Sequence, residues 1–195
     1  MQSSRETIGK RDDRRVRRTR KLLEQGLVQL LEEKSIHSIT VRELTNLIDI
    51  NRGTFYLYYQ DIYDMVEKLE EEYISRLIAM LDRHQEEDLS VRMREVSREL
   101  FSFIEENKRL CKVLLSENGD IHFLQSLNSV IHDRYRGFHE RLRMDEATFE
   151  YRYAFTVFGL LGVIRRWLAA DCDWPAEKMA ALAEMSIRTG VFRQS

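Results

Sequence analysis

The sequence predicts an all-α fold, in which a small N-terminal domain precedes a larger C-terminal helical bundle. Its 195 residues include one proline and eight glycines, and no run of Val, Ile and Thr alternates between turn residues. Apolar residues recur instead at intervals of three and four, which is the spacing of amphipathic helices. With 43% hydrophobic residues, the chain has enough apolar side chains to bury a substantial core.

Positive charge is concentrated at the beginning of the chain. Residues 1–21 hold nine Lys and Arg against three Asp and Glu. Residues 1–12 have no apolar period and are expected to form a flexible basic arm, followed by a helix from about Asp13 to Glu33. Because phosphate contacts dominate affinity for nucleic acids, Arg17 and Arg18 are expected to add charge against a DNA backbone. The alternative is a charged face that is merely solvated.

Two short helices follow, and together they indicate a helix-turn-helix. Thr40 is a suitable cap for the first helix, with Glu43 three residues further on, and Asn51 is a suitable cap for the second. The link 48–50 is too short to separate domains, so the two helices must pack on each other at a steep angle. The second helix then offers its outer face to a major groove.

The residues of this region have different expected roles. Arg52 and Thr54 are the first candidates for contacts with base edges, and Gly53 permits close approach of the backbone to DNA. The residues expected to be structural are Leu44, Leu47 and Phe55. The residues expected to reach phosphates are Thr40, Asn51, Tyr56 and Tyr58, with Arg42 adding charge.

Six further helices are expected after the helix-turn-helix. The first begins at Asp61, which can cap it, and extends to about Glu87, so it is long enough to join two domains. The others are expected at 91–107, 110–115, 123–142, about 145–170 and from Pro175 onward, with a turn at 117–120.

The string Arg52-Gly53-Thr54-Phe55-Tyr56, with Thr40 to Leu44 before it, resembles the DNA-binding signature of the TetR family of bacterial transcriptional regulators. Members of this family mostly carry Ala then Gly where this chain has Ile48 and Asp49, and Lys where it has Ile62. The first difference is expected to require a slightly different turn. The second is expected to remove a phosphate contact.

The resemblance implies a homodimer, in which the last two helices of each subunit pair with those of a second subunit as a four-helix bundle. Gly159 and Gly162 agree with this, because glycine is costly in a helix interior unless a neighbour comes close. The alternative is that this region is core within one subunit. The expected interface residues are Phe158, Gly159, Gly162, Arg166, Leu182 and Met185.

The resemblance also implies a sensing cavity in the C-terminal domain, with a small apolar or aromatic ligand as a further partner. Small-molecule sites are mostly apolar, although aromatic residues at helical spacing are more often plain core. The aromatic candidates for its lining are Phe101, Phe123, Tyr135, Phe138, Tyr151, Phe155 and Trp167.

Other chemistries have little support in the sequence. The five histidines lack the spacing of a helical metal site, Cys111 and Cys172 form no metal motif, and no phosphate-binding glycine loop or nucleophile motif occurs. We therefore expect no catalytic residues, no metal and no cofactor. The lack of a long apolar run and the charged N-terminus predict no membrane partner and a cytoplasmic location.

The sequence therefore predicts a dimeric TetR-like repressor. Residues 1–60 would bind a palindromic operator in double-stranded DNA, and residues 61–195 would dimerise and sense a ligand that releases the operator. Two alternatives stay open, a coactivator of the same shape that binds a protein and not DNA, and a small helical enzyme or ligand-binding protein. Binding to the DNA upstream of the gene separates the three.

Overall fold

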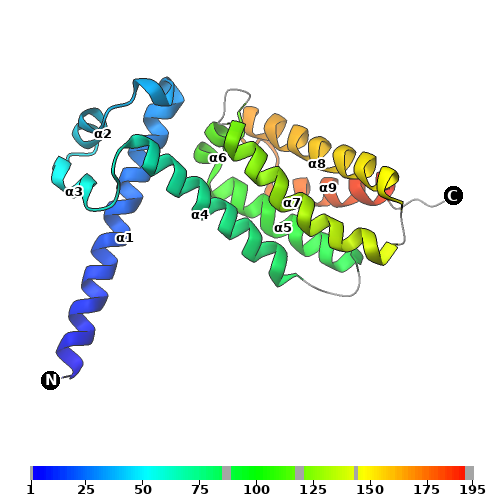
Figure 1. Ribbon diagram of the computed structural model, residues 1–195, viewed down its shortest axis with the longest axis horizontal. Helices are drawn as coiled ribbons and strands as arrows, with labels where there is room; N and C mark the ends of the chain where they lie inside the picture. The colour runs from blue at the N-terminus through cyan, green and yellow to red at the C-terminus, as the bar shows by residue number, and fades with distance from the viewer. Residues whose placement is uncertain (1, 85–88, 117–120, 143–144, 192–195) are drawn as a thin grey trace. The chain divides into compact units, whose positions relative to one another are not determined.

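The computed structural model of the protein confirms the all-α prediction. It describes residues 2–84, 89–116, 121–142 and 145–191, without the side chains of 2–13, 89, 121, 137–142 and 189–191. These residues form nine α-helices and one short 3-10 helix, and no strand (Figure 1). None of the helices described is long and apolar enough to cross a membrane. The chain divides into two compact units, Met1–Leu69 (unit 1) and Glu70–Ser195 (unit 2).

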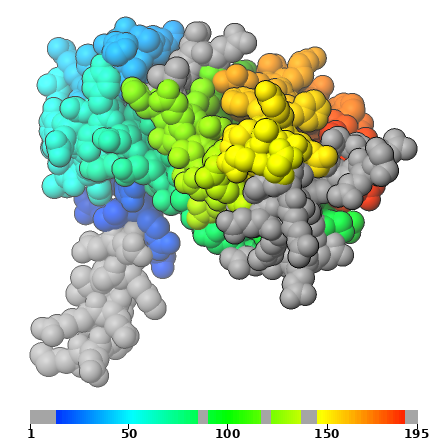
Figure 2. Space-filling model, turned by 45° about the vertical axis from the view of Figure 1, so that its right-hand side comes forward, coloured from blue at the N-terminus to red at the C-terminus, as the bar shows by residue number. Residues whose placement is uncertain are grey.

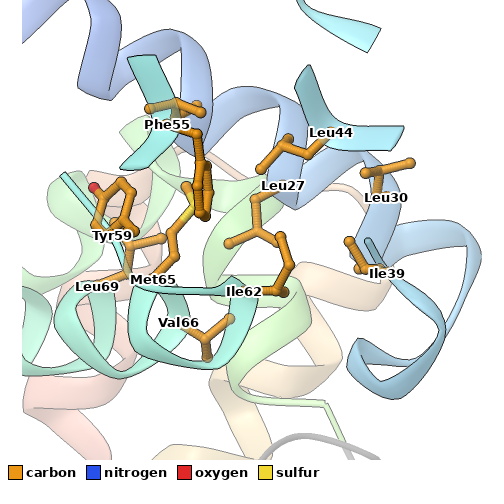
Figure 3. Packing of buried hydrophobic residues seen from close by; sticks show 11 residues of the cluster. Leu27, Leu30, Ile39, Leu44, Phe55, Tyr59, Ile62, Met65, Val66 and Leu69 are labelled. Carbon is orange, nitrogen blue, oxygen red and sulfur yellow. The ribbon is translucent and has the colours of Figure 1, made fainter. Parts of the chain in front are cut away.

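Unit 1 is a small helical domain closed around one hydrophobic core. It contains α1 (Gln2–Glu33), the 3-10 helix η1 (Ile36–Ser38), α2 (Val41–Leu47), α3 (Arg52–Tyr56) and the first turns of α4 (Ile62–Arg83). All four α-helices contribute buried side chains to this core (Figure 3). The core residues are Leu23, Leu27, Leu30, Ile39, Leu44, Phe55, Tyr59, Ile62, Met65, Val66 and Leu69.

Helix α1 is longer than predicted. It begins at Gln2, so the segment expected to be a flexible arm is helical in the described residues. The physical reason is that residues 2–12 contain no proline and a single glycine, Gly9, and include several residues with good helix propensity. Packing begins later, since Val16 is 37% exposed and Leu23 is the first core residue of α1.

Side-chain caps fix the start of α4. Asp61 Oδ1 accepts a hydrogen bond from Asp64 N at 2.9 Å, which confirms Asp61 as a cap. Asp64 Oδ2 accepts from Lys68 Nζ at 2.9 Å and from Gln60 N at 2.8 Å. These two hydrogen bonds hold the pKa of Asp64 below its ordinary value of 3.8, and the bond from Lys68 has the larger effect. The carboxylate is therefore ionised at neutral pH.

The division between the units falls inside α4, between Leu69 and Glu70, whereas the sequence placed it at residue 60. The first turns of α4 belong to unit 1 because Ile62, Met65 and Leu69 are buried in its core. One continuous helix therefore contributes residues to both units.

Helices α1 and α2 pack tightly at Gly26. A Cβ atom at this position would lie 2.6 Å from Cγ2 of Ile48 and 2.9 Å from Cδ1 of Leu44. The branched side chain of Ile48 has few rotamers available, so Cγ2 cannot easily turn away. Members of the TetR family mostly carry alanine where this chain has Ile48. The bulkier isoleucine fits here because residue 26 has no side chain.

We predict that Gly26→Ala lowers the free energy of unfolding by about 1–3 kcal/mol, because the added methyl group overpacks this contact. Ile48→Ala in the same chain should recover much of the loss, since it removes Cγ2. Urea unfolding of both single variants and the double variant measures the coupling between the positions. If the losses in the free energy of unfolding of the two single variants simply add in the double variant, the two side chains do not compete for space.

Unit 2 is a bundle of helices whose positions agree with the predicted ones to within a few residues. Helix α5 packs against α9, and α8 contacts α6, α7 and α9. Figure 2 shows α7 and α8 side by side on the surface of this unit. The predicted turn at 117–120 and the predicted end of α4 near Glu87 lie outside the described residues. The helices are α5 (Leu89–Glu106), α6 (Lys108–Leu114), α7 (Ile121–Leu142), α8 (Glu146–Ala169) and α9 (Ala176–Val191).

Trp167 anchors the C-terminal end of α8 in unit 2. Its side chain is 2% exposed, and its ring lies 5.4 Å from the ring of Phe101. The indole Nε1 donates a hydrogen bond to the carbonyl oxygen of Trp174 at 2.8 Å. This bond ties α8 to the loop before α9, where Asp171 and Cys172 have positive φ values of 56° and 60°.

Candidate nucleic-acid interface

The start of α2 is capped as the sequence predicts. Thr40 Oγ1 accepts a hydrogen bond from Glu43 N at 3.2 Å, which satisfies one of the free amides of the first turn. The carboxylate of Glu43 forms an ion pair with Lys34, just beyond the end of α1. Thr40 and Arg42 are both exposed at this end of α2.

The turn between α2 and α3 is closed by two backbone hydrogen bonds of the Schellman type. Ile50 N donates to Thr45 O at 3.0 Å, and Asp49 N donates to Asn46 O at 3.4 Å. Asp49 has a φ of 53°, the left-handed conformation that glycine adopts most easily. The chain therefore makes the turn that a glycine favours, with an aspartate in its place. The sequence had suggested a turn slightly different from that of family members with glycine at this position.

We predict that Asp49→Gly raises the free energy of unfolding by about 0.5–1 kcal/mol, because it removes the left-handed strain at some cost in chain entropy. Asp49→Ala is the control, since it deletes the carboxylate and keeps the strain. Thermal unfolding compares the three proteins. An equal gain in both variants would show that the carboxylate, and not the backbone, is unfavourable there.

Helix α3 is short and is held from both ends. Asn51 Oδ1 accepts a hydrogen bond from Gly53 N at 2.7 Å, so the predicted cap is confirmed. Phe55, the last residue but one of the helix, is fully buried in the core of unit 1. Tyr58 N and Tyr59 N both donate to Phe55 O, at 2.9 and 3.1 Å, which continues the helical path by one turn.

The face of α3 away from the core is open to solvent. Arg52 and Gly53 are exposed, Tyr56 is 58% exposed, and Thr54 and Tyr58 are half-buried. A Cβ on Gly53 would meet only Asn51 Oδ1, at 3.2 Å, so the backbone is accessible there. The structure thus brings the predicted base-reading and phosphate-binding residues of α3 onto and beside one exposed surface.

Leu57 also belongs to this surface, although the sequence analysis did not single it out. Its side chain is 77% exposed, the highest value among the exposed large hydrophobic residues of unit 1. The signal was present in the sequence, because a residue two positions after the buried Phe55 must lie on the opposite side of a helix.

The basic residues of α1 before the core are exposed. Arg14, Arg15, Arg17 and Arg18 all present their side chains to solvent in the turns before Leu23. The structure therefore leaves the two predicted phosphate contacts, Arg17 and Arg18, on the surface of unit 1.

Leu47 differs from its expected surroundings. Leu47 was expected to be structural, but it is 42% exposed and lines a shallow, largely polar hollow between α1 and α2 with Thr40 and Arg42. The apolar stripe of α2 is too short to bury the last turn of the helix, and Leu44 is the residue of this stripe that is fully buried in the core. Ile62 is 4% exposed within the core of unit 1, so this position cannot reach a phosphate.

In unit 2, the predicted dimer residues of α8 and α9 lie at the surface of the subunit. Phe158 is 58% exposed and Met185 is 51% exposed. Among the residues that the structure describes, a Cβ on Gly159 or Gly162 would meet nothing within 4 Å, so no described neighbour packs closely against these glycines. Arg166 is exposed and Leu182 is half-buried.

The aromatic candidates for a ligand cavity fall into different environments. Tyr151 and Phe155 are 81% and 69% exposed, so they line no cavity within the subunit and extend the apolar face of α8 that includes Phe158. Tyr135 is half-buried, with its ring 5.7 Å from that of Tyr153. The side chain of Phe138 lies outside the described residues, and the remaining candidates, Phe101, Phe123 and Trp167, are buried.

The cysteines are poorly placed for thiolate chemistry. Burial raises the pKa of Cys111 to about 12, and burial also raises the pKa of Cys172. Both groups are therefore protonated at neutral pH. In the residues that the structure describes, no group of three or more His, Cys, Asp or Glu side chains is arranged to hold a metal ion.

Comparison with known proteins adds a family model to these observations. The model described as the transcriptional regulator C-terminal region matches residues 92–189. No curated protein matches the sequence.

Several solved structures share the fold. The fatty acid degradation regulator FadR from Bacillus halodurans has a TM-score of 0.69 at 14% identity, covering 90% of this chain and 97% of that chain. FadR from Bacillus subtilis, solved in complex with stearoyl-CoA, has a TM-score of 0.67 at 14% identity, covering 87% and 98%. The TetR family regulator PfmR from Thermus thermophilus has a TM-score of 0.65 at 16% identity, covering 88% and 99%. Identities this low establish a common fold alone.

Proposed function

The chain belongs to the TetR family of transcriptional regulators, and from this premise we propose that it is a dimeric repressor that binds a palindromic operator through unit 1. The observation that carries the proposal is the arrangement of α3. Phe55 anchors this helix in the core, while Arg52, Gly53 and Tyr56 face solvent, as the residues of a helix that enters a major groove must.

The residues of the interface would then have distinct roles. Arg52 would read a guanine edge, and Thr54 a methyl group or an acceptor, at positions where Gly53 lets the helix approach. The phosphate contacts would come from Thr40, Asn51, Tyr56 and Tyr58, with charge added by Arg17, Arg18 and Arg42.

Selection of bound duplexes from a random library tests the proposal directly. The expected result is a palindromic sequence whose half-sites lie about 34–36 Å apart or modestly further, as two-fold related recognition helices require. The selected duplex should also be bound at physiological salt and occur near the gene. If no duplex is enriched, the protein-binding coactivator becomes the better hypothesis.

We predict that Arg52→Ala weakens operator binding by about 1–3 kcal/mol and relaxes the preference at one base position. Arg18→Ala is the matched control, because it also removes one exposed arginine but from α1. It should weaken all sequences alike and reduce the salt slope by about one. Gel-shift titrations of selected and scrambled duplexes measure both effects, and an unchanged sequence preference in Arg52→Ala would exclude Arg52 as a base reader.

Dimerisation is the second part of the proposal. The exposed apolar face of α8, with open space beside Gly159 and Gly162, supports pairing of this surface with a second copy of the chain. A two-fold axis at this surface would make the same patch meet itself.

Ligand control is the third part. FadR from Bacillus subtilis was solved with stearoyl-CoA, so a long-chain acyl thioester is the first ligand class to test in unit 2. Titration of the protein–operator complex with an acyl-CoA, with free coenzyme A as control, should release the operator if this ligand class acts here. A coupling free energy of about 1–3 kcal/mol between the ligand site and the DNA-binding surface would lower operator affinity by a factor between several-fold and more than a hundredfold.

A further inference from the structure

We infer that Leu57 is a specificity-determining residue of the operator interface, and that it recognises the C5-methyl group of a thymine in each half-site. The inference rests on the proposed function, because it requires that α3 enters a major groove. It adds a thymine contact to the base-edge contacts proposed for Arg52 and Thr54.

The first step is the position of Leu57 on the helix. Leu57 follows α3 with φ −70° and ψ −21°, so its backbone is still helical. At 3.6 residues per turn, Gly53 and Leu57 each lie about 160° around the axis from Phe55, on opposite sides of it. Since Phe55 points into the core, Gly53 and Leu57 form the outermost ridge of the recognition helix.

The second step is the difference between the two residues of this ridge. Gly53 carries no side chain, so the helix can come close to the duplex at its beginning. One turn later, Leu57 carries a branched apolar side chain that is 77% exposed. When the ridge enters a groove, Leu57 is the side chain that the ridge itself presents to the bases, because Gly53 has none.

The third step is the chemistry of the groove. A single exposed leucine is ordinary on a protein surface, but an apolar side chain on this ridge must face base edges. Those edges present hydrogen-bond donors and acceptors and one apolar group, the thymine methyl. Contact with this methyl lets Leu57 bury apolar surface without leaving a donor or acceptor unpaired.

The test replaces thymine by deoxyuridine, which removes only the methyl group. In the duplex selected by the wild-type protein, each thymine pair related by the palindrome is replaced in turn. We expect one symmetric pair to matter, with binding weakened about fourfold for each half-site, as loss of one buried methyl predicts. Fluorescence anisotropy with labelled duplexes measures the affinities.

The same measurement is then made with three variants. Leu57→Ala should bind the thymine and deoxyuridine duplexes equally, and Leu57→Met should restore part of the difference. Leu47→Ala removes another exposed leucine, from α2, and should keep the full difference. Because Leu57 is so exposed, thermal unfolding of Leu57→Ala should match the wild type.

The outcomes separate the inference from the proposed function. If the wild-type protein binds no duplex, both fail. If it binds an operator with the same affinity whether thymine or deoxyuridine stands at each tested pair, the inference alone is overturned. A difference that persists undiminished in Leu57→Ala also overturns it, since the methyl group then acts through another residue or through DNA shape.

Discussion

Replacing Phe55 by Ala is expected to lower the free energy of unfolding of unit 1 by about 3–5 kcal/mol, as for other large aromatic side chains removed from a core. Operator binding should be lost with it, although Phe55 itself faces away from DNA. The ring is fully buried and lies 5.6 Å from the ring of Tyr59, beside Leu27 and Met65 (Figure 3). Without this ring, α3 has only one short turn and its cap to hold it.

Hydrogen exchange of unit 1 amides and gel-shift titration measure the two effects of this substitution. Phe55→Leu is the control, because it keeps most of the apolar volume and should retain partial stability and binding. Unit 2 should remain folded, since its core contains other residues, among them Trp167 and Phe101. Loss of binding in a Phe55→Ala protein with wild-type protection would mean that the ring touches DNA directly.

Replacing Phe158 by Asp is expected to weaken dimerisation by about a hundredfold or more, because an uncompensated charge buried at an interface costs about 3–5 kcal/mol. The two-fold axis makes the effect stronger, since both subunits bring the new carboxylate to the same surface. Operator affinity should fall as well, because two half-sites are no longer bound by one linked molecule.

Sedimentation velocity over a range of concentrations measures this change in oligomeric state. Val91→Asp is the matched control, since it places the same charge on another exposed apolar residue of unit 2, on α5. The control should remain dimeric. A Phe158→Asp protein that sediments as a dimer at low concentration would show that the subunits pair through another surface.

Features fixed by local chemistry were predictable from the sequence. The caps at Thr40, Asn51 and Asp61 depend on a side-chain oxygen two or three residues before a free amide, which the sequence displays directly. Helical spacing likewise identified Leu44 and Phe55 as buried. These signals do not require knowledge of what packs against a helix.

Features decided by packing partners were harder to predict. Leu47 and Ile62 both stand at the margin of an apolar stripe, and only the neighbouring helices decide that one is exposed and the other buried. Tyr151 and Phe155 look like core residues by spacing, yet α8 presents them to solvent. The left-handed Asp49 had only an indirect signal, the glycine that the TetR family mostly carries there, because an aspartate by itself does not predict that conformation.

The contact between Gly26 and Ile48 has a consequence for how this protein can change over generations. Enlarging residue 26 is disfavoured while Ile48 is present, whereas shrinking residue 48 first opens the space. The order in which the two mutations arise is therefore constrained, although the end states are both compatible with the fold. Among descendants of this gene, side-chain volumes at the two positions should vary inversely, and a deep mutational library of the pair would reveal the same pattern.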